Sequence, residues 1–405
     1  MVNLFMKFRN QQRIQKCRGF SLIELLIAMA VTIIIAAAAL MLFKNSLDTN
    51  NIAMLRAEMQ ANARAAANSI SQDLNLTGIG MPWGGLGLPS NGAAAETFAT
   101  NYLTKNTFYN NTLFGITPSY QGGPVISNTT MDGITMVYQD PVLSDTTQLG
   151  WNWTVNPVNS MVSGGANTVV MTLPTAANAV APQVPMNPAV NNPSYGLQIG
   201  DVLLIKGNQK LAAGVITGLD AANGIVTFGS PDAFNINQFG LGFNGNIPSL
   251  GDPGTNPRTY TNANTFNVMR IYIITYFLQP VDANGNVLPA ASLNNAPDYR
   301  LMRQVNAQPA TVVAEHIDYL RFSYDLTDPS CLVAPYIGAE PDAINSGAAC
   351  NNNVAFNAFS QIRSVNISLA ARTAKPDKNG QYYHDTVNTT VSPRMLSYNN
   401  TYPPS

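Results

Sequence analysis

One apolar run near the N-terminus constrains the fold of this chain more than any other feature. Residues 20–43 contain only three polar side chains, those of Ser21, Glu24 and Thr32. As a helix rising about 1.5 Å per residue, the run spans roughly 36 Å, enough to cross a hydrocarbon core of about 30 Å. The run therefore predicts a membrane-spanning helix.

The residues before the run set its orientation. Residues 1–19 carry no acidic side chain and five basic ones: Lys7, Arg9, Arg13, Lys16 and Arg18. Because basic residues that flank a span stay on the cytoplasmic side, they predict a cytoplasmic N-terminus and an exported C-terminal part. An ordinary secretory signal would have a shorter apolar core, of roughly 7–15 residues, and a small-residue cleavage site. No clear site of that kind closes this run.

Glu24 is the residue that a plain membrane anchor leaves unexplained. A carboxylate at the centre of a spanning helix costs about 2.5–3.5 kcal/mol on insertion scales, so such a residue usually has a partner. The alternative is a side chain that merely extends to the near interface of the membrane. The position of Glu24 within the run favours a specific role.

The stretch GFSLIELLIAM, residues 19–29, resembles the class III signal of type IV pilins and the related secretion pseudopilins. The resemblance implies that a prepilin peptidase cuts after Gly19 on the cytoplasmic side, and that the new terminus, Phe20, is N-methylated. It also implies that Glu24 neutralises the Phe20 amine of a neighbouring subunit as the helix enters the filament core. Two charges that are costly alone in an apolar medium become tolerable as a pair.

The helix is expected to continue beyond the span with one buried face. Apolar residues recur at spacings of three and four, which places them on one side of a helix. They are Ile52, Leu55, Met59, Ala63, Ala66, Ile70 and Leu74. Gly78, Gly80 and Pro82 make further helix costly, so the amphipathic part is expected to cover residues 44–77.

The rest of the chain, residues 78–405, is expected to form a β-rich globular head. Gly and Pro are abundant, at 30 and 26 residues, and short strand-like runs alternate with turn signals such as Asn223–Gly224. The predicted fold class is α+β and pilin-like, with one long N-terminal helix and a large, mainly antiparallel β head. An inserted β subdomain is expected near residues 195–245.

Charge argues against nucleic acid as a direct partner. The whole chain has a net charge of −1, and removing a leader with five basic residues and no acid leaves −6. No basic run lies outside the leader, so the electrostatic footprint of phosphate binding is missing.

The cysteines predict one disulfide in the exported part. Cys17 leaves with the leader, and Cys331 and Cys350 remain as an even pair where disulfides persist. A bridge between them would stabilise the head by about 3 kcal/mol in the chain-entropy model. Two unpaired thiols are the alternative, and no CxxC or paired histidine supports a metal site.

The remaining candidates for chemistry are weak, and neither a catalytic residue nor a cofactor is predicted. The two histidines, His316 and His384, and Ser90 lie in no catalytic motif. Three polar residues at alternate positions resemble half of a calcium loop, although a hairpin turn is favoured over a metal site. They are Asp282, Asn284 and Asn286. Trp151 and Trp153 could stack on a sugar, but core packing is favoured.

The order of several short motifs resembles the PilW-type minor pilins, relatives of the J-type pseudopilin of type II secretion. These motifs include RAAANSISQDLNLTGIGM, LQIGDVLLI and VVAEHIDYLRFSYDL. The resemblance implies a minor pilin of a type IV pilus that supports motility, adhesion or DNA uptake. A secretion pseudopilin and a pilus-tip adhesin are the alternatives.

The same resemblance implies partners and a location. The expected partners are the prepilin peptidase, other pilins reached through the N-terminal helix, an inner-membrane assembly platform, and membrane lipid before assembly. The protein is expected in the inner membrane as a single-pass protein with a periplasmic head, and then in a pilus at the cell surface.

Overall fold

The structure is a computed structural model of the full chain, and it forms two compact units, residues 1–55 and 56–405. It describes residues 21–82, 85–89, 112–119, 121–140, 153–155, 161–165, 168–173, 196–206, 211–220, 222–238, 247–250, 266–292, 294, 296–326, 362–377 and 380–394. Gly19, Phe20, Ser90, Trp151, Cys331 and Cys350 lie outside these ranges.

The predicted N-terminal helix is present as one element, α1, which runs for 55 residues from Leu22 to Leu76. It begins where the backbone N–H of Leu25 donates to the carbonyl of Ser21. It ends before Gly78, whose φ of +84° is a conformation that glycine adopts without a steric penalty. The backbone N–H of Gly78 then donates to the carbonyl of Val137, 3.0 Å away.

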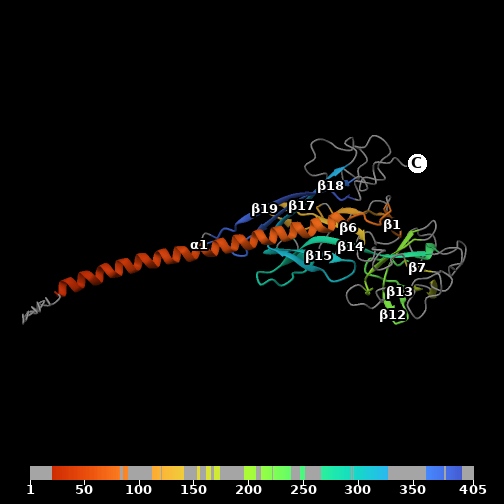
Figure 1. Ribbon diagram of the computed structural model, residues 1–405, viewed down its shortest axis with the longest axis horizontal. Helices are drawn as coiled ribbons and strands as arrows, with labels where there is room; N and C mark the ends of the chain where they lie inside the picture. The colour runs from red at the N-terminus through yellow and green to blue at the C-terminus, as the bar shows by residue number, and fades with distance from the viewer. Residues whose placement is uncertain are drawn as a thin grey trace, which may run out of the picture. The chain divides into compact units, whose positions relative to one another are not determined.

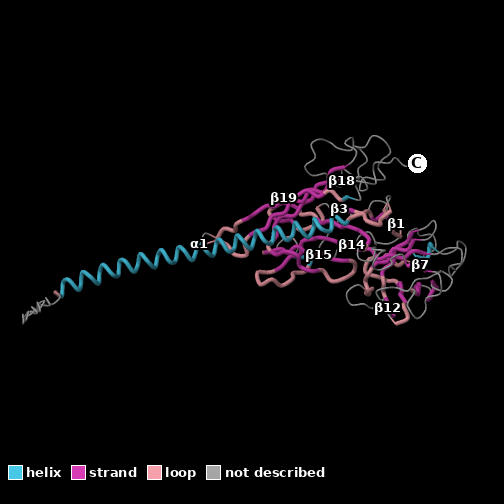
Figure 2. The backbone as a smooth tube through the Cα atoms, viewed as in Figure 1, coloured by secondary structure: helices cyan, strands magenta, loops and turns pink. Residues whose placement is uncertain are grey.

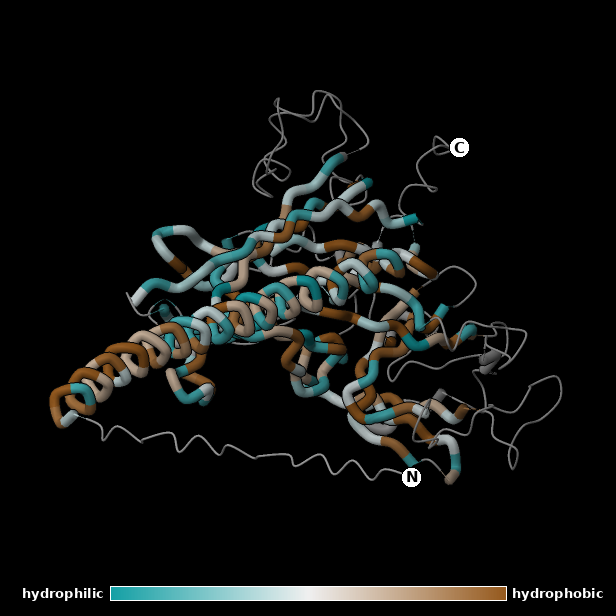
Figure 3. Tube along the Cα trace, turned by 60° about the vertical axis from the view of Figure 1, so that its left-hand side comes forward, coloured by the Kyte–Doolittle hydropathy of each residue, from teal (hydrophilic) through white to brown (hydrophobic). Residues whose placement is uncertain are grey.

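The first unit contains the apolar part of this helix. Its large side chains are exposed, with 81% of Leu22, 62% of Leu26 and 70% of Leu42 accessible. By length and composition α1 is apolar enough to cross a membrane. In Figure 3 most of the trace at this end of the helix has the colour of hydrophobic residues.

The second unit begins at Arg56, and here the helix has the single buried face that its spacing predicts. The buried residues of α1 are Met59, Ala63, Ala66, Ala67, Ile70, Asp73 and Leu74. Arg64, which lies away from this face, is exposed. The small alanines let the helix backbone approach the strands that it covers.

The largest sheet of the head is built around β14 (Phe266–Val281), a 16-residue strand of mostly β-branched and aromatic residues. One side of β14 pairs with β10 (Val202–Lys206) and then with β15 (Asp298–Val305). The other side pairs with β7 (Trp153–Val155) and then with β6 (Gly133–Gln139). The sheet is completed by β11 (Leu211–Val215), β16 (Thr311–Glu315) and β3 (Ile116–Ser119).

Two further multi-stranded sheets complete the β structure. One has the order β17 (Ile317–Leu326), β18 (Ile362–Arg372) and β19 (His384–Val391). The other has the order β12 (Gly218–Asp220), β13 (Ile225–Gly229), β9 (Thr168–Thr172) and β8 (Met161–Gly165). The predicted hairpin at Asn223–Gly224 is confirmed as the β12–β13 connection.

Short elements fill the connections. They are the strand pairs β1 (Leu86–Gly87) with β2 (Thr112–Leu113) and β4 (Val125–Ile126) with β5 (Thr129–Thr130), and the 3₁₀ turns η3 (Ile247–Leu250) and η4 (Ala290–Ser292). Every strand pairing in the described ranges is antiparallel, which confirms the predicted fold class of one long helix and an antiparallel β head.

The main core of the head lies between the helix and two sheets. Figures 1 and 2 show the C-terminal part of α1 running along β6, β14 and β15, with β17, β18 and β19 nearby. Helix residues Ala66 and Ile70 share this core with Ile274 of β14 and Leu369 of β18. A separate core joins β9 and β13 to β10 and β11. The inserted subdomain near residues 195–245 stays a prediction.

Candidate functional site

Glu24 lies in the first turn of α1, where the partial positive charge of a helix N-terminus favours a carboxylate. Its side chain is exposed, and it makes no hydrogen bond or ion pair to any residue that the structure describes. It stands among exposed apolar residues, including Ile23 and Leu25. This end of the helix therefore presents an apolar surface that carries one carboxylate with no partner in the described chain.

The opposite end of the helix contains a second carboxylate, which is buried and hydrogen-bonded within the chain. Asp73 lies within the last turn of α1 and is 6% exposed. A negative charge is unfavourable near a helix C-terminus, so this position needs compensation. Four donors from three strands supply it.

The four donors divide evenly between the two oxygens of Asp73. Its Oδ1 accepts from the Tyr138 hydroxyl at 2.8 Å and from Arg303 Nη2 at 3.0 Å. Its Oδ2 accepts from the Tyr276 hydroxyl at 2.6 Å and from Arg303 Nε at 2.7 Å. The two Arg303 bonds form a bidentate pair, the strongest geometry for a guanidinium and a carboxylate. We call these four residues the Asp73 cluster.

The cluster also reaches one turn back along the helix. The Ser69 hydroxyl lies 2.7 Å from the Tyr276 oxygen. Because the single proton of Tyr276 goes to Asp73, Ser69 is the donor in this contact. Tyr138 comes from β6, Tyr276 from β14 and Arg303 from β15, so one helical turn is bonded to three adjacent strands.

Burial and the nearby carboxylate set the protonation states in the cluster. Burial, with the charge of Asp73, raises the pKa of both Tyr138 and Tyr276 well above the usual tyrosine value. Burial lowers the pKa of Arg303, but the hydrogen bonds and charge of Asp73 outweigh that effect and raise it overall. Both phenols therefore stay protonated donors and Arg303 stays a cation at any pH compatible with folding.

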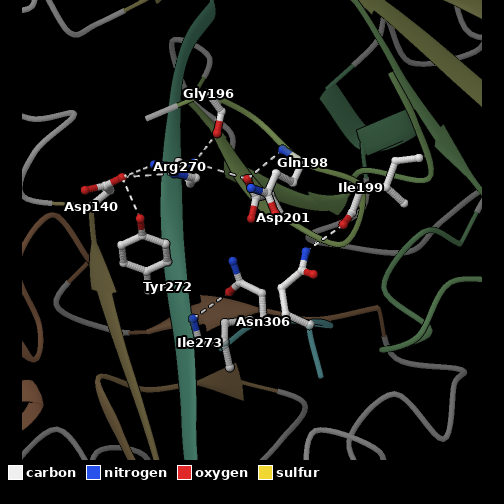
Figure 4. Close-up of polar contacts among 10 residues, drawn as sticks. Asp140, Gly196, Gln198, Ile199, Asp201, Arg270, Tyr272, Ile273 and Asn306 are labelled. Carbon is white, nitrogen blue, oxygen red and sulfur yellow. Dashed lines mark hydrogen bonds and ion pairs between the residues drawn. The ribbon is translucent and has the colours of Figure 1, made fainter. Parts of the chain in front are cut away.

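A second buried cluster surrounds Arg270 of β14 and is drawn in Figure 4. Arg270 is 7% exposed, and its Nη2 lies 2.5 Å from Asp140 Oδ2. Its Nη1 donates to the Gly196 carbonyl at 2.8 Å and lies 3.2 Å from Asp201 Oδ2. The Tyr272 hydroxyl also donates to Asp140, at 2.9 Å.

The Arg270 cluster stabilises the fold by joining strands. Burial raises the pKa of Asp201 even though the Arg270 charge opposes it. Asp140 follows β6 and Asp201 precedes β10, so the guanidinium joins the ends of two strands to the first third of β14. The guanidinium is occupied by protein partners on both sides, and the cluster presents no open cation to a ligand.

A third group of charges contains one of the two histidines. His316 Nδ1 lies 2.5 Å from Asp298 Oδ2, and Arg372 Nη2 donates to Asp298 Oδ1 at 2.9 Å. The hydrogen bond to Asp298 raises the pKa of His316. Burial pushes the pKa of Asp298 up, but the His316 bond and the two cations lower it overall. The group is an ion-paired corner between β15 and β18, and it lacks a nucleophile that a histidine could activate.

The weak candidate at Asp282 is a closed turn in the structure. The Asp282 carboxylate accepts from the backbone N–H groups of Asn284 and Asn286, both at 2.8 Å, and from the Asn286 amide at 2.9 Å. These bonds, strongest from Asn286, lower the pKa of Asp282. Within the described ranges no group of three His, Cys, Asp or Glu residues is arranged to hold a metal.

Two other candidates each lie at the start of a strand. Trp153 begins β7, which pairs with the start of β14. His384 begins β19, and its Nδ1 lies 2.6 Å from Asp318. The processing residues and the cysteine pair stay predictions, because they lie outside the described part of the chain.

The sequence singles out Glu24 as a candidate, but it does not identify the Asp73 cluster. Asp73 occupies a position on the buried face of the amphipathic helix, between Ile70 and Leu74, and that misplaced charge was the available signal. Its partners lie 65, 203 and 230 residues away, and no local pattern connects them.

Comparison with known proteins bears on the N-terminal end. Residues 14–40 match the family model of the prokaryotic N-terminal methylation motif. No curated protein and no solved structure matches the chain. The motif implies processing by a prepilin peptidase and pilus assembly, and with an apolar helix it is consistent with an inner-membrane stage followed by a pilus. Proteins of this kind are generally structural and non-enzymatic. The chain therefore carries a class III prepilin motif on a long helix that precedes an antiparallel β head, an arrangement similar to that of type IV pilins.

Proposed function

We propose that the protein is a minor pilin, similar to the PilW type, that enters a type IV pilus or primes its assembly. The observation that carries the proposal is one continuous helix with two kinds of surface. Its N-terminal part exposes apolar side chains around Glu24, and its C-terminal part is bonded into a large β head through Asp73.

The mechanism assigns a separate task to each end of the helix. Cleavage after Gly19 creates a positive amine on Phe20 and makes Glu24 the fifth residue of the mature chain. Glu24 pairs with the Phe20 amine of a neighbouring subunit, because either charge alone would be costly in an apolar filament core. The Asp73 cluster holds the head on the helix, so that a pull on the filament is transmitted to the head.

The head suits a subunit that supports motility, attachment or DNA uptake without catalysis. Its buried charged clusters are satisfied by protein partners, as shown by the four donors on Asp73 and the two carboxylates on Arg270. A secretion pseudopilin shares the signal and the helix, and it is the competing assignment that the experiment must separate.

The test is to follow the tagged full-length protein in cells that make its filament. We expect it in sheared pili at a small fraction of the amount of the major pilin. Its N-terminal peptide should begin at Phe20 and have the mass expected for one added N-methyl group. A gene deletion should reduce piliation and leave type II secretion intact. Loss of secretion with normal pili would identify a pseudopilin, and a mature terminus near residue 31 or beyond would overturn the pilin assignment.

A further inference from the structure

Two long strands form edges of the sheets that the structure describes. They are β17 and β19, with 10 and 8 residues, the outer strands of a three-stranded sheet. The outermost strands of the other multi-stranded sheets have at most five residues. Because the outer backbone groups of an edge strand are unpaired, long edges are the places where a strand from another chain can add.

The chain covers the β17 edge itself. The backbone N–H of Asp132 donates to the Leu320 carbonyl at 2.9 Å. The Asp132 carboxylate accepts from the Phe322 N–H at 2.9 Å, and the Met131 sulfur accepts from the Leu320 N–H at 3.2 Å. Asp132 is 2% exposed, and burial raises the pKa of its carboxyl group. The buried Asp132 carboxylate therefore occupies a backbone donor of this edge and so blocks the addition of another strand.

The register shows which groups of β19 face outward. The Thr373 N–H donates to the Tyr383 carbonyl, so the residues of β19 that bond to β18 are Asp385, Val387, Thr389 and Val391. The backbone groups of His384, Thr386, Asn388 and Thr390 point the other way. Within the described ranges, no residue bonds to these four outward backbone groups.

Three exposed side chains along this edge carry no charge that would discourage pairing. Thr386, Asn388 and Thr390 are exposed and uncharged, and the β18–β19 register has no bulge. Natural proteins usually protect a long edge with lysine, proline, a bulge or a covering loop. The chain uses such a cover on β17, and the described chain has none on β19.

The location of β19 indicates which occupant to expect. Tyr383, the residue before β19, lies under the guanidinium of Arg56, 4.1 Å from the ring centroid. Arg56 directly follows the exposed apolar part of α1, the surface through which pilin subunits are expected to meet. The edge therefore begins beside a helix residue that follows, in sequence, the segment expected to bring neighbouring subunits together, and a second contact between subunits already joined gains from high effective concentration.

We propose that β19 is a strand-addition site that receives an extended, uncharged strand from a neighbouring pilin-type subunit, an inference that rests on the proposed minor-pilin function. The incoming backbone bonds to the outward groups of His384, Thr386, Asn388 and Thr390. Small polar side chains at alternate positions let the two strands approach without a charge being buried between them.

Two edge variants and a matched control test the site in the full-length protein. Asn388→Pro removes one outward donor and leaves the β18 ladder intact, and Thr386→Lys adds a charge at the edge. Since one backbone hydrogen bond changes an equilibrium constant about fivefold, each variant should fall about fivefold or more in sheared filaments. Ala222→Lys, an exposed turn position away from the edge, should stay at the wild-type level. Thermal unfolding in detergent should be unchanged in all three.

A photo-crosslinking amino acid at position 388 identifies the occupant. We expect a crosslink, mapped by mass spectrometry, to an extended segment of another subunit that has a class III signal. A crosslink to this chain's own residues, or equal amounts of Asn388→Pro and wild type in filaments, would overturn the site while leaving the minor-pilin function in place. Absence of the wild-type protein from sheared filaments would instead overturn the function on which the site rests.

Discussion

Glu24 and Asp73 are carboxylates near opposite ends of the same helix, and their surroundings differ in every respect. Asp73 is buried and accepts four hydrogen bonds from its own chain, while Glu24 is exposed and has no partner within the described residues. A carboxylate with all its partners in the chain serves folding. One that lies in an apolar surface without a partner calls for a partner from outside.

The difference also divides the expected consequences of mutation. Changes at Asp73 should lower the stability of the head in the isolated protein. Changes at Glu24 should leave that stability unchanged and act only when subunits assemble. The following substitutions test this division, in order of decreasing expected effect.

The largest effect on stability is expected from Asp73→Asn. The amide presents an N–H₂ group to donors from Arg303 and the two tyrosines, so part of the cluster is left without an acceptor. Breaking a buried ion pair in this way should lower the free energy of unfolding by about 3–5 kcal/mol. Denaturant unfolding of the full-length protein in detergent, followed by near-ultraviolet circular dichroism, measures this loss.

Two further variants make the Asp73 prediction specific. Asp48→Asn changes the same side chain at an exposed position of α1 and should alter stability by no more than about 0.5 kcal/mol. Asp73→Leu combined with Arg303→Leu removes both charges and should cost less than Asp73→Asn alone. Equal stability of wild type and Asp73→Asn would show that the cluster does not hold the head on the helix.

The features that could be predicted from the sequence are those that depend on local contacts, and the features that could not depend on distant ones. The helix, its buried face and its end at Gly78 depend on spacings within a few turns, and the structure has all three. Glu24 was identifiable because its motif is contiguous. The Arg270 cluster and the Asp132 contact to β17 were not, because their partners come from strands tens to hundreds of residues apart. A charged residue inside an apolar strand, such as Arg270, indicates that a partner exists but not which residue it is.

The second prediction concerns Glu24→Gln, which keeps the size of the side chain and removes its charge. Leaving the amine of Phe20 unpaired in the filament core should cost several kcal/mol, about what breaking a buried pair costs. Membrane insertion should persist, because a neutral amide is no harder to insert than a carboxylate. The processed variant should therefore accumulate in the inner membrane and be missing from sheared filaments, as immunoblots of both fractions would show.

A control at the neighbouring position separates charge from motif. Ser21→Ala lies in the same signal and should leave filament levels unchanged. The unfolding free energy of the head should match the wild type in both variants. Wild-type amounts of Glu24→Gln in filaments would mean that the carboxylate has another role.

The third prediction distinguishes the two tyrosines of the Asp73 cluster. Tyr276→Phe removes a donor to Asp73 and also the acceptor of the Ser69 hydroxyl, whereas Tyr138→Phe removes a donor alone. Each lost hydrogen bond is worth about 1 kcal/mol, so Tyr276→Phe should cost about 2 kcal/mol and Tyr138→Phe about 1 kcal/mol. The same denaturant titration measures both, and a reversed order would show that Ser69 does not depend on Tyr276.

The smallest effect is a pH dependence at the ion-paired corner, where Asp298, Arg372 and Glu315 surround His316. Because folding raises the pKa of His316, its charge contributes stability that is fully present below the unfolded value of about 6.5. That contribution is lost as the pH rises through the folded pKa. The lowered pKa of Asp298 acts in the opposite range, and its contribution is lost as acid protonates it.

His316→Asn isolates the contribution of the protonated imidazole to stability. Asparagine tolerates the positive φ of +59° at this position but is too short to reach Asp298. At pH 6 the variant should be less stable than the wild type by about 1 kcal/mol, the value of one partly exposed, charge-assisted hydrogen bond. The difference should shrink as the pH rises through the raised pKa of His316, because the wild-type imidazole then loses its proton. His384→Asn removes the exposed histidine and should change stability by less than about 0.5 kcal/mol on either side of that pKa. A stability difference at His316 that does not depend on pH would mean that the imidazole packs as a neutral ring and that the Arg372 pair alone balances Asp298.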